Sequence, residues 1–190
     1  MFIHLNTHSV YSPMRGLISL PELISLSKFN GMDTLALTDV NGMWGFIRFV
    51  QHCKDAGMFP IAGTNLITEK DEVVLLAENQ FGYENICRAV SAVHDDPSRS
   101  VVDIVHPLSS GLFILANDEF TLKALMDFIP DTHLFIELRP GIQESEAHHL
   151  SKKLKLEIVA TGDVYFRSPS DHDAHVTLRP IEKNTTLQQL

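Results

Sequence analysis

Apolar and polar residues alternate along the first eight positions of the chain. Ile3 and Leu5 lie on one side of this alternation, and His4, Asn6 and His8 lie on the other. Because successive side chains of a β-strand point to opposite faces, the pattern predicts a strand over residues 2–8. A histidine at a strand end usually takes part only in a hydrogen bond, and it becomes a metal ligand where other strand ends supply partners.

The remainder of the chain alternates between helical spacing and short apolar runs. Helical spacing predicts helices over residues 20–29, 44–56, 81–93, 120–128, 142–154 and 170–181, with one short helical turn over 101–106. The apolar runs predict strands over 34–38, 59–66, 72–77, 112–116, 133–138 and 157–160, and the charged residues 69–71 join the second and third of these as a hairpin. Strands that alternate with helices predict an α/β domain with a parallel sheet, either open or rolled into a barrel.

Composition and charge narrow the class of protein. The net charge of −9 argues against a large nucleic-acid footprint. No stretch approaches the roughly 20 apolar residues of a membrane span, and the first residues do not resemble a signal peptide. Cys53 and Cys87 lack metal-type spacing, so we expect reduced core thiols in a cytoplasmic protein. Trp44 is expected in the core, as are the phenylalanines at helical spacing.

The organisation along the chain is that of one domain. There is no internal repeat, low-complexity tract or linker between residues 1 and 190. Leu187 and Leu190 are apolar with nothing after them to pack against, which suggests that the chain is the front part of a longer one.

Polar residues collect at the predicted carboxyl ends of the strands, where α/β domains place their functional groups. They are His8, Asp39, Asn65, Asn117, Asp118, Glu137, Arg139, Asp163 and Tyr165. His8, Asp39 and Asp163 are the best candidates for metal ligands, and Glu137 is a weaker one. Three groups could hold one ion weakly, but they do not suggest a metal cluster.

Four stretches in order resemble a known family. They are HLNTHSVYSPMRG, GMDTLALTDVNGMWGFIRF, PIAGTNL and VATGDVYFRSPSDHDAHVTLRPIEKNTTL. Together they resemble the PHP (polymerase and histidinol phosphatase) domain, in the version that opens bacterial DNA polymerase III alpha subunits. Met14-Arg15-Gly16 and Asp163-Val164-Tyr165 are most similar to the error-prone relatives, and replicative alpha subunits that have lost their PHP ligands are the alternative. The resemblance implies a distorted seven-stranded (β/α) TIM-like barrel.

The family's metal-binding motifs are altered at five positions. His-x-His reads Asn6-Thr7-His8, the acidic residue before a glycine is Arg15, and Thr-Asp-His reads Thr38-Asp39-Val40. Asn65 replaces a glutamate, and the closing Asp-x-His reads Asp163-Val164-Tyr165. An amide is a poor ligand, valine is none, and arginine repels a cation. The expected remnant is His8, Asp39 and Asp163, with His4, Asn6, Arg15, Asn65, Glu137 and Tyr165 as neighbours. No tightly bound cofactor is expected.

Three hypotheses for function follow. The first is a non-catalytic PHP domain that braces a polymerase module, in DNA replication or translesion synthesis, and binds little DNA itself. The resemblance implies a proofreading exonuclease subunit as a further partner. The second is a metal-dependent phosphoesterase or 3′–5′ exonuclease in which His8, Asp39 and Asp163 recruit one Mn, Zn or Fe ion. The third is a regulator that binds a small phosphate-bearing ligand through Arg15. A simpler interpretation of His8 and Asp163 is a hydrogen-bonded pair across the mouth of the barrel.

Overall fold

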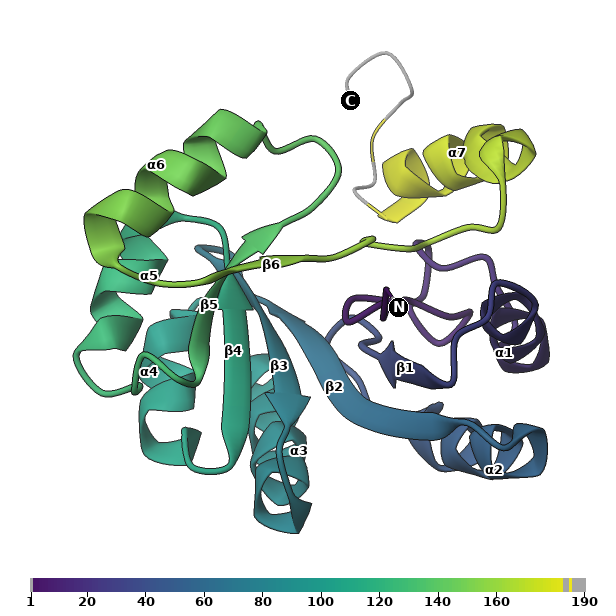
Figure 1. Ribbon diagram of the computed structural model, residues 1–190, viewed down its shortest axis with the longest axis horizontal. Helices are drawn as coiled ribbons and strands as arrows, with labels where there is room; N and C mark the ends of the chain where they lie inside the picture. Colours follow the sequence, from purple (N-terminus) through teal and green to yellow (C-terminus); the bar gives the residue numbers. More distant parts are fainter. Residues whose placement is uncertain (1, 183–184, 186–190) are drawn as a thin grey trace.

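The computed structural model describes residues 2–182 and Thr185, which form a curled sheet with helices on its outer side (Figure 1). The strands are β1 (Thr34–Leu37), β2 (Phe59–Ile67), β3 (Glu72–Ala77), β4 (Leu112–Ala116), β5 (Leu134–Leu138) and β6 (Ile158–Ala160). The helices are α1 (Leu20–Phe29), α2 (Phe46–Ala56), α3 (Gln80–Asp95), α4 (Val101–Val105), α5 (Glu119–Met126), α6 (Glu144–Leu154) and α7 (His172–Glu182), with 3₁₀ turns at His106–Leu108 and Pro169–Asp171. The predicted alternation of strands and helices is confirmed.

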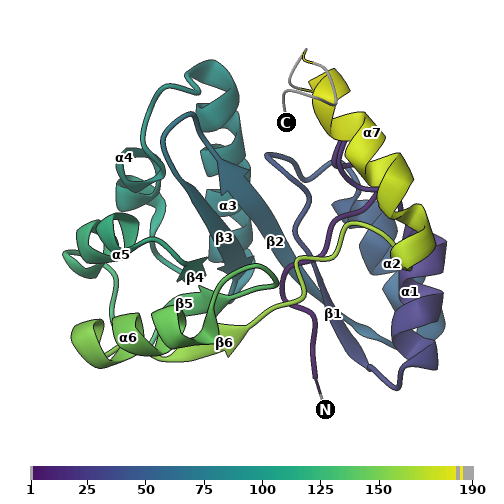
Figure 2. The same ribbon diagram turned by 90° about the horizontal axis from the view of Figure 1, so that it is seen from above.

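The sheet has its six strands in sequence order, but it is mixed rather than wholly parallel. β1 and β2 are parallel, β3 is antiparallel to both β2 and β4, and β4, β5 and β6 are parallel. The antiparallel pairing of β2 with β3 is the hairpin predicted from the charged turn. Seen from above, the sheet curls into a half-barrel, with α3 to α6 outside one part and α1, α2 and α7 at the other (Figure 2).

The predicted first strand is an irregular extended segment, so the described residues form six strands rather than seven. This segment lies between β1 and the chain that follows β6. The backbone N–H of Ala36 donates to the His4 carbonyl at 3.1 Å, and that of His8 donates to the Val164 carbonyl at 2.8 Å. One isolated bridge, between Thr7 and Val164, is all the regular pairing it has.

Side-chain hydrogen bonds explain why this segment forms no regular ladder. The backbone N–H of Thr7 donates to the Thr38 hydroxyl at 2.7 Å, and the Thr7 hydroxyl donates to the Ala36 carbonyl at 2.8 Å. Threonine side chains thus take bonds that backbone groups make in a continuous strand. The alternation of apolar and polar residues gives no sign of this competition between side-chain and backbone hydrogen bonds.

Two apolar layers cover the outer face of the sheet. The larger lies under α3 to α6 and includes Leu75, Ile86 and Leu122, and the smaller lies under α1 and α2 and includes Phe49 and Cys53. Burial raises the pKa of the Cys53 thiol to about 11, in keeping with the expected core thiol. None of the helices within the described residues is both long and apolar enough to cross a membrane.

The expectation that Trp44 belongs to the core is wrong. Its side chain is 56% exposed, and it contacts the ring of His94 at a centroid distance of 5.8 Å. The predicted helix began at Trp44, whereas α2 begins at Phe46. Trp44 therefore lies in the loop before α2 and not on the buried face of that helix.

Candidate functional site

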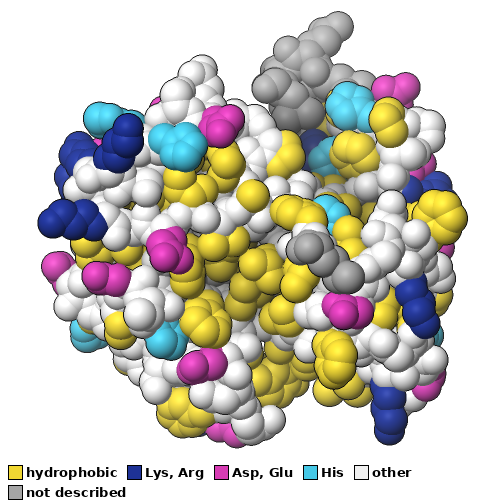
Figure 3. Space-filling view, viewed as in Figure 1, with side chains coloured by type: hydrophobic (Ala, Val, Ile, Leu, Met, Phe, Trp, Pro, Cys, Tyr) yellow, Lys and Arg dark blue, Asp and Glu magenta, His cyan; other side chains and the backbone are white. Residues whose placement is uncertain are grey.

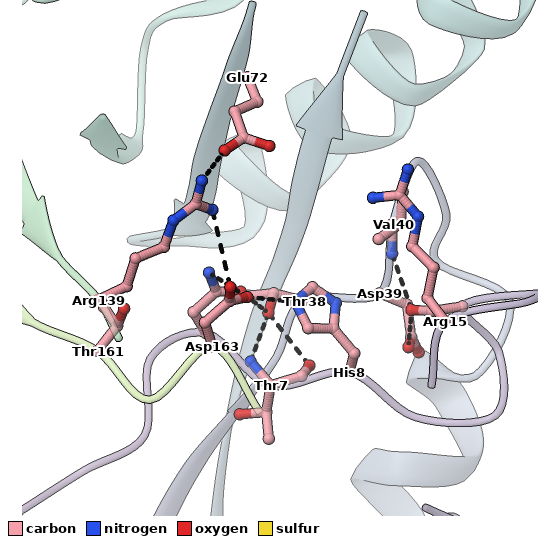
Figure 4. Close-up of polar contacts among 12 residues, drawn as sticks. Thr7, His8, Arg15, Thr38, Asp39, Val40, Glu72, Arg139, Thr161 and Asp163 are labelled. Carbon is pink, nitrogen blue, oxygen red and sulfur yellow. Dashed lines mark hydrogen bonds and ion pairs between the residues drawn. The ribbon is translucent and has the colours of Figure 1, made fainter. Parts of the chain in front are cut away.

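A polar cluster fills the mouth of the half-barrel at the carboxyl ends of the parallel strands. Arg139 follows β5, and Asp163 follows β6. Glu72 comes from the start of β3, because this strand is antiparallel to its neighbours and its start lies at the same end of the sheet. Figure 4 shows the Arg139 side chain reaching from one side toward Glu72 and Asp163. We call Arg139, Glu72, Glu137 and Asp163 the Arg139 cluster.

The guanidinium of Arg139 lies among three carboxylates. Its Nη2 contacts Glu72, and its Nη1 lies 3.9 Å from Oδ2 of Asp163 and 4.0 Å from Oε2 of Glu137. Burial alone would lower the pKa of Arg139, but the negative charges of these neighbours outweigh that effect and raise it. A permanent cation therefore sits where carboxylates from β3, β5 and the segment after β6 converge.

Neutral side chains donate hydrogen bonds to Glu137, which is nearly fully buried. The Asn6 amide donates to Oε1 of Glu137 at 2.9 Å, and the Thr161 hydroxyl donates to the same oxygen at 2.6 Å. The amide oxygen of Asn6 accepts from the Thr38 hydroxyl at 2.9 Å. Burial raises the pKa of Glu137, although these hydrogen bonds and Arg139 favour its charged form. Asn6 thus links the first segment to β1 and β5 without adding charge.

His8 and Asp163 form the pair that the sequence suggested. Nε2 of His8 lies 3.3 Å from Oδ1 of Asp163, and the His8 ring stacks on Tyr165 at 4.0 Å between centroids. Burial would raise the pKa of Asp163, but the hydrogen bond from His8 and the charge of Arg139 outweigh it and lower that pKa. Burial, together with the charge of Asp163, raises the pKa of the Tyr165 phenol, so this ring stays neutral.

The lowered pKa of Asp163 predicts a pH-dependent contribution to stability. Because the folded-state pKa lies below the ordinary value of 3.8, the carboxylate stabilises the fold above that pH, and the contribution is lost as the pH falls through the folded-state pKa. Asp163→Asn should therefore lower the free energy of unfolding near neutral pH and make little difference near pH 2, by urea unfolding at several pH values. The exposed Asp173→Asn is the control and should have little effect at any pH. A constant difference for Asp163→Asn across this range would contradict the charge-based role.

Asp39 accepts hydrogen bonds from the segment after His8 and is not part of the Arg139 cluster. Its Oδ1 accepts from the backbone N–H of Ser9 and from the Ser12 hydroxyl, both at 2.7 Å, and its Oδ2 accepts from the Ser9 hydroxyl at 2.8 Å. The Ser12 oxygen also accepts from the backbone N–H of Val40 at 3.0 Å. These bonds tie the segment after His8 to the end of β1. Among the predicted ligands, the structure therefore brings His8 and Asp163 together and holds Asp39 in a separate network (Figure 4).

Arg15 also has a partner of its own. Its Nε lies 2.6 Å from Oε1 of Glu182, and Nδ1 of His175 donates to the Arg15 carbonyl at 2.9 Å. Both partners belong to α7, so Arg15 joins the loop before α1 to that helix. The Nε of Arg15 is thus already engaged by a carboxylate, which Glu182 shares with Arg179, and this engagement weakens the hypothesis of an anion contact.

Three buried polar side chains have atoms without a hydrogen-bond partner among the described residues. They are Nδ1 of His4, Nδ1 of His8, and both amide atoms of Asn65. His8 and Asn65 are almost fully buried, whereas His4 is half-buried and burial lowers its pKa. Unsatisfied atoms of this kind call for a water or another small group.

The donor set does not fit a divalent ion. Asp39 already accepts three hydrogen bonds, and Arg139 lies about 4 Å from Glu137 and Asp163. Within residues 2–182 and Thr185, no three His, Cys, Asp or Glu side chains are grouped so as to hold a metal ion. A divalent ion needs at least three protein ligands, and a nearby guanidinium opposes it.

Sequence reasoning missed Glu72, because it considered only residues that follow their strands. The signal was available in the predicted hairpin: a strand that runs antiparallel to its neighbours brings its first residue to the shared end. Arg139 was included among the strand-end residues, but its role as the central cation was not predicted.

The fold is that of two solved structures named as hydrolases. One is from Bifidobacterium adolescentis and is named as a candidate metal-dependent phosphoesterase; it shares 10% identity and a TM-score of 0.61, over 88% of this chain and 89% of the other. The second is an amidohydrolase from Chromobacterium violaceum with bound sulfate, at 12% identity and a TM-score of 0.58, over 86% and 87% of the two chains. A family model described as "PHP domain" matches residues 4–166, and the chain belongs to this family.

The chain is also similar to parts of bacterial DNA polymerases. The DNA polymerase III subunit alpha of Pasteurella multocida is 28% identical over 223 residues, which cover 98% of this chain and 19% of the relative. An error-prone DNA polymerase of Symbiobacterium thermophilum is 39% identical over 94 residues, 49% of this chain and 9% of the relative. The chain thus spans about a fifth of the length of the alpha subunits it matches.

Proposed function

We propose that this PHP domain has no metal-dependent activity and serves as a structural, partner-binding module of a DNA polymerase III alpha-like protein. The observation that carries the proposal is the contact of Arg139 with Glu72, Glu137 and Asp163. The guanidinium supplies, from within the chain, positive charge that these converging carboxylates would otherwise take from an ion.

The chemistry of the cluster supports this proposal. Metal-dependent hydrolysis uses the ion to activate water and to stabilise charge on the phosphoryl group. A guanidinium keeps its proton at any physiological pH, so it neither generates hydroxide nor leaves an open coordination position. A guanidinium can instead hold three carboxylates from different parts of the chain in one arrangement. We therefore assign the cluster to fastening β3, β5 and the segment after β6.

The relatives support a polymerase module as the partner. The matched alpha subunits are about five times longer than this chain, so their homologous part is joined to much more protein. The role would lie in DNA replication or, as the error-prone relative suggests, in translesion synthesis. A proofreading exonuclease subunit and a cytoplasmic location remain predictions. The acidic net charge argues against extensive direct contact between this domain and DNA.

The alternative is a phosphoesterase or 3′–5′ exonuclease with a reduced metal site. The observation that favours it is the pair of unpartnered buried groups, Nδ1 of His8 and the amide of Asn65. A water could satisfy them equally well, and the alternative also requires Arg139 to move away from Asp163.

Activity assays with a matched variant distinguish these two functions. The protein is incubated with Mn²⁺, Zn²⁺ or Fe²⁺, and hydrolysis of p-nitrophenyl phosphate and degradation of DNA from its 3′ end are measured. The proposal predicts the same background rate for the native protein and for Asp163→Asn, provided that circular dichroism shows both to be folded. Metal-dependent hydrolysis that Asp163→Asn abolishes would overturn the proposal in favour of the alternative.

A further inference from the structure

The half-barrel has an apolar hollow at the end opposite the Arg139 cluster. It is a pocket of about 330 Å³ on the concave face of the sheet. Its lining includes Leu5, Ile61, Leu76, Phe113, Phe135 and Val159. Phe135 and Glu137 lie two residues apart on β5 and therefore share the concave face, with Phe135 nearer the start of the strand. One face of the sheet thus carries a charged cluster at one end and an apolar pocket at the other.

The hollow is open to solvent although its walls are apolar. Phe113 and Phe135 are only half-buried, and their rings lie 6.3 Å apart. Figure 3 looks onto this end of the molecule and shows apolar side chains gathered in the hollow between the two halves of the half-barrel. Partly exposed aromatic rings that line one concavity are typical of a binding surface, because scattered apolar residues do not form such a cavity.

Acidic side chains surround the hollow. Glu78 lines it and is exposed. Asp33 and Glu157, both exposed, come directly before β1 and β6, whose first residues lie at this end of the sheet. Asp and Glu side chains border the apolar patch in Figure 3, and the Lys and Arg side chains lie mainly toward the edge of the view. Nε2 of His133 lies 3.7 Å from Oε1 of Glu78.

We propose that this hollow binds one aromatic or large aliphatic side chain presented by a lysine- or arginine-rich protein segment. The pocket supplies apolar contact for the side chain, and the acidic rim attracts the basic residues on either side of it. The inference deepens the partner-binding part of the proposed function by naming a surface and the chemistry of its ligand.

The charge of the chain selects this occupant over a second copy of itself. Two copies would bring acidic rims together and carry a net charge of −9 each, so association through this face would be repulsive. An apolar small molecule would contact the pocket walls but would not be attracted by the acidic rim. A basic segment with an apolar side chain interacts with the walls and with the rim.

Peptide binding tests the proposal. The probe is a synthetic pentapeptide with a central phenylalanine between pairs of lysines, and the matched probes replace the phenylalanine with alanine or the lysines with glutamates. Titration followed by NMR chemical shifts should show saturable binding of the first peptide, with shifts at Phe113 and Phe135. Either matched peptide should bind at least five-fold more weakly, and added salt should weaken binding of the first.

Surface variants provide the second arm. Glu78→Lys should weaken binding of the lysine peptide at least five-fold, whereas Glu84→Lys, an exposed change on α3, should leave it nearly unchanged. Phe113→Ala, checked for folding by circular dichroism, should also weaken it. Absence of binding, equal binding of the three peptides, or equal effects of the two lysine variants would overturn the proposal. So would dimerisation through this face in sedimentation experiments. Hydrolysis in the phosphoesterase assay would leave these outcomes unaffected, so the two proposals fail separately.

Discussion

Arg139→Ala is expected to lower the free energy of unfolding by about 3 kcal/mol, the scale found when one partner of a buried ion pair is removed. The substitution leaves Glu137 and Asp163 close together without a cation, and Glu137 has only 3% of its side chain exposed. The loss should shrink at acidic pH, where the carboxylates are protonated and no longer need Arg139. Urea unfolding near neutral pH and near pH 2, below the lowered pKa of Asp163, measures both effects.

The control is Arg167→Ala. Arg167 pairs with Glu22 and Asp171, but its side chain is 47% exposed, and surface pairs contribute little to stability. If Arg139→Ala cost no more than this control, the Arg139 cluster would not fasten the strands as we infer. Arg139→Lys should recover only part of the loss, because one ammonium cannot reach three carboxylates as a planar guanidinium does.

Asp39→Ala is expected to destabilise the fold by about 3 kcal/mol, because it leaves one backbone N–H and two hydroxyl groups of the first segment without their acceptor. The lost partners are Ser9 and Ser12, which join the segment after His8 to the end of β1. Thermal or urea unfolding measures the change. The same loss should appear with and without EDTA, since the carboxylate acts through hydrogen bonds.

Smaller changes at the same place provide the controls. Asp39→Asn keeps one acceptor oxygen and should lose less stability than Asp39→Ala. Ser12→Ala removes one donor and should cost about 1 kcal/mol. A stabilising effect of added Mn²⁺ or Zn²⁺ that Asp39→Ala removes would show instead that Asp39 is a metal ligand.

Much of the fold could be predicted from the sequence, because apolar spacing reports burial directly. The prediction gave β4 over 112–116 and β3 over 72–77 with the bounds that the structure has. It was wrong where side chains compete with the backbone for hydrogen bonds. The first segment alternates like a strand, yet the bonds of Thr7 with Thr38 and Ala36 keep it irregular.

Only part of the candidate site could be predicted, because the sequence pattern locates residues but not the directions of their side chains. The position of a residue at a strand end can be inferred from the pattern, so His8 and Asp163 were expected together, and they are. The direction of a side chain depends on local partners. Asp39 follows its strand as expected but turns to Ser9 and Ser12, and nothing in the spacing of Arg139 indicates that its guanidinium reaches across to β3.

The central claim is that the Arg139 cluster takes the place of bound metal. Its most direct test is the metal content of the untagged protein, measured by mass spectrometry before and after incubation with manganese, zinc and iron and removal of unbound ions. The account predicts essentially no retained metal in either case, for the native protein and for Asp163→Asn alike. Retention of one or more equivalents by the native protein, lost in Asp163→Asn, would contradict it.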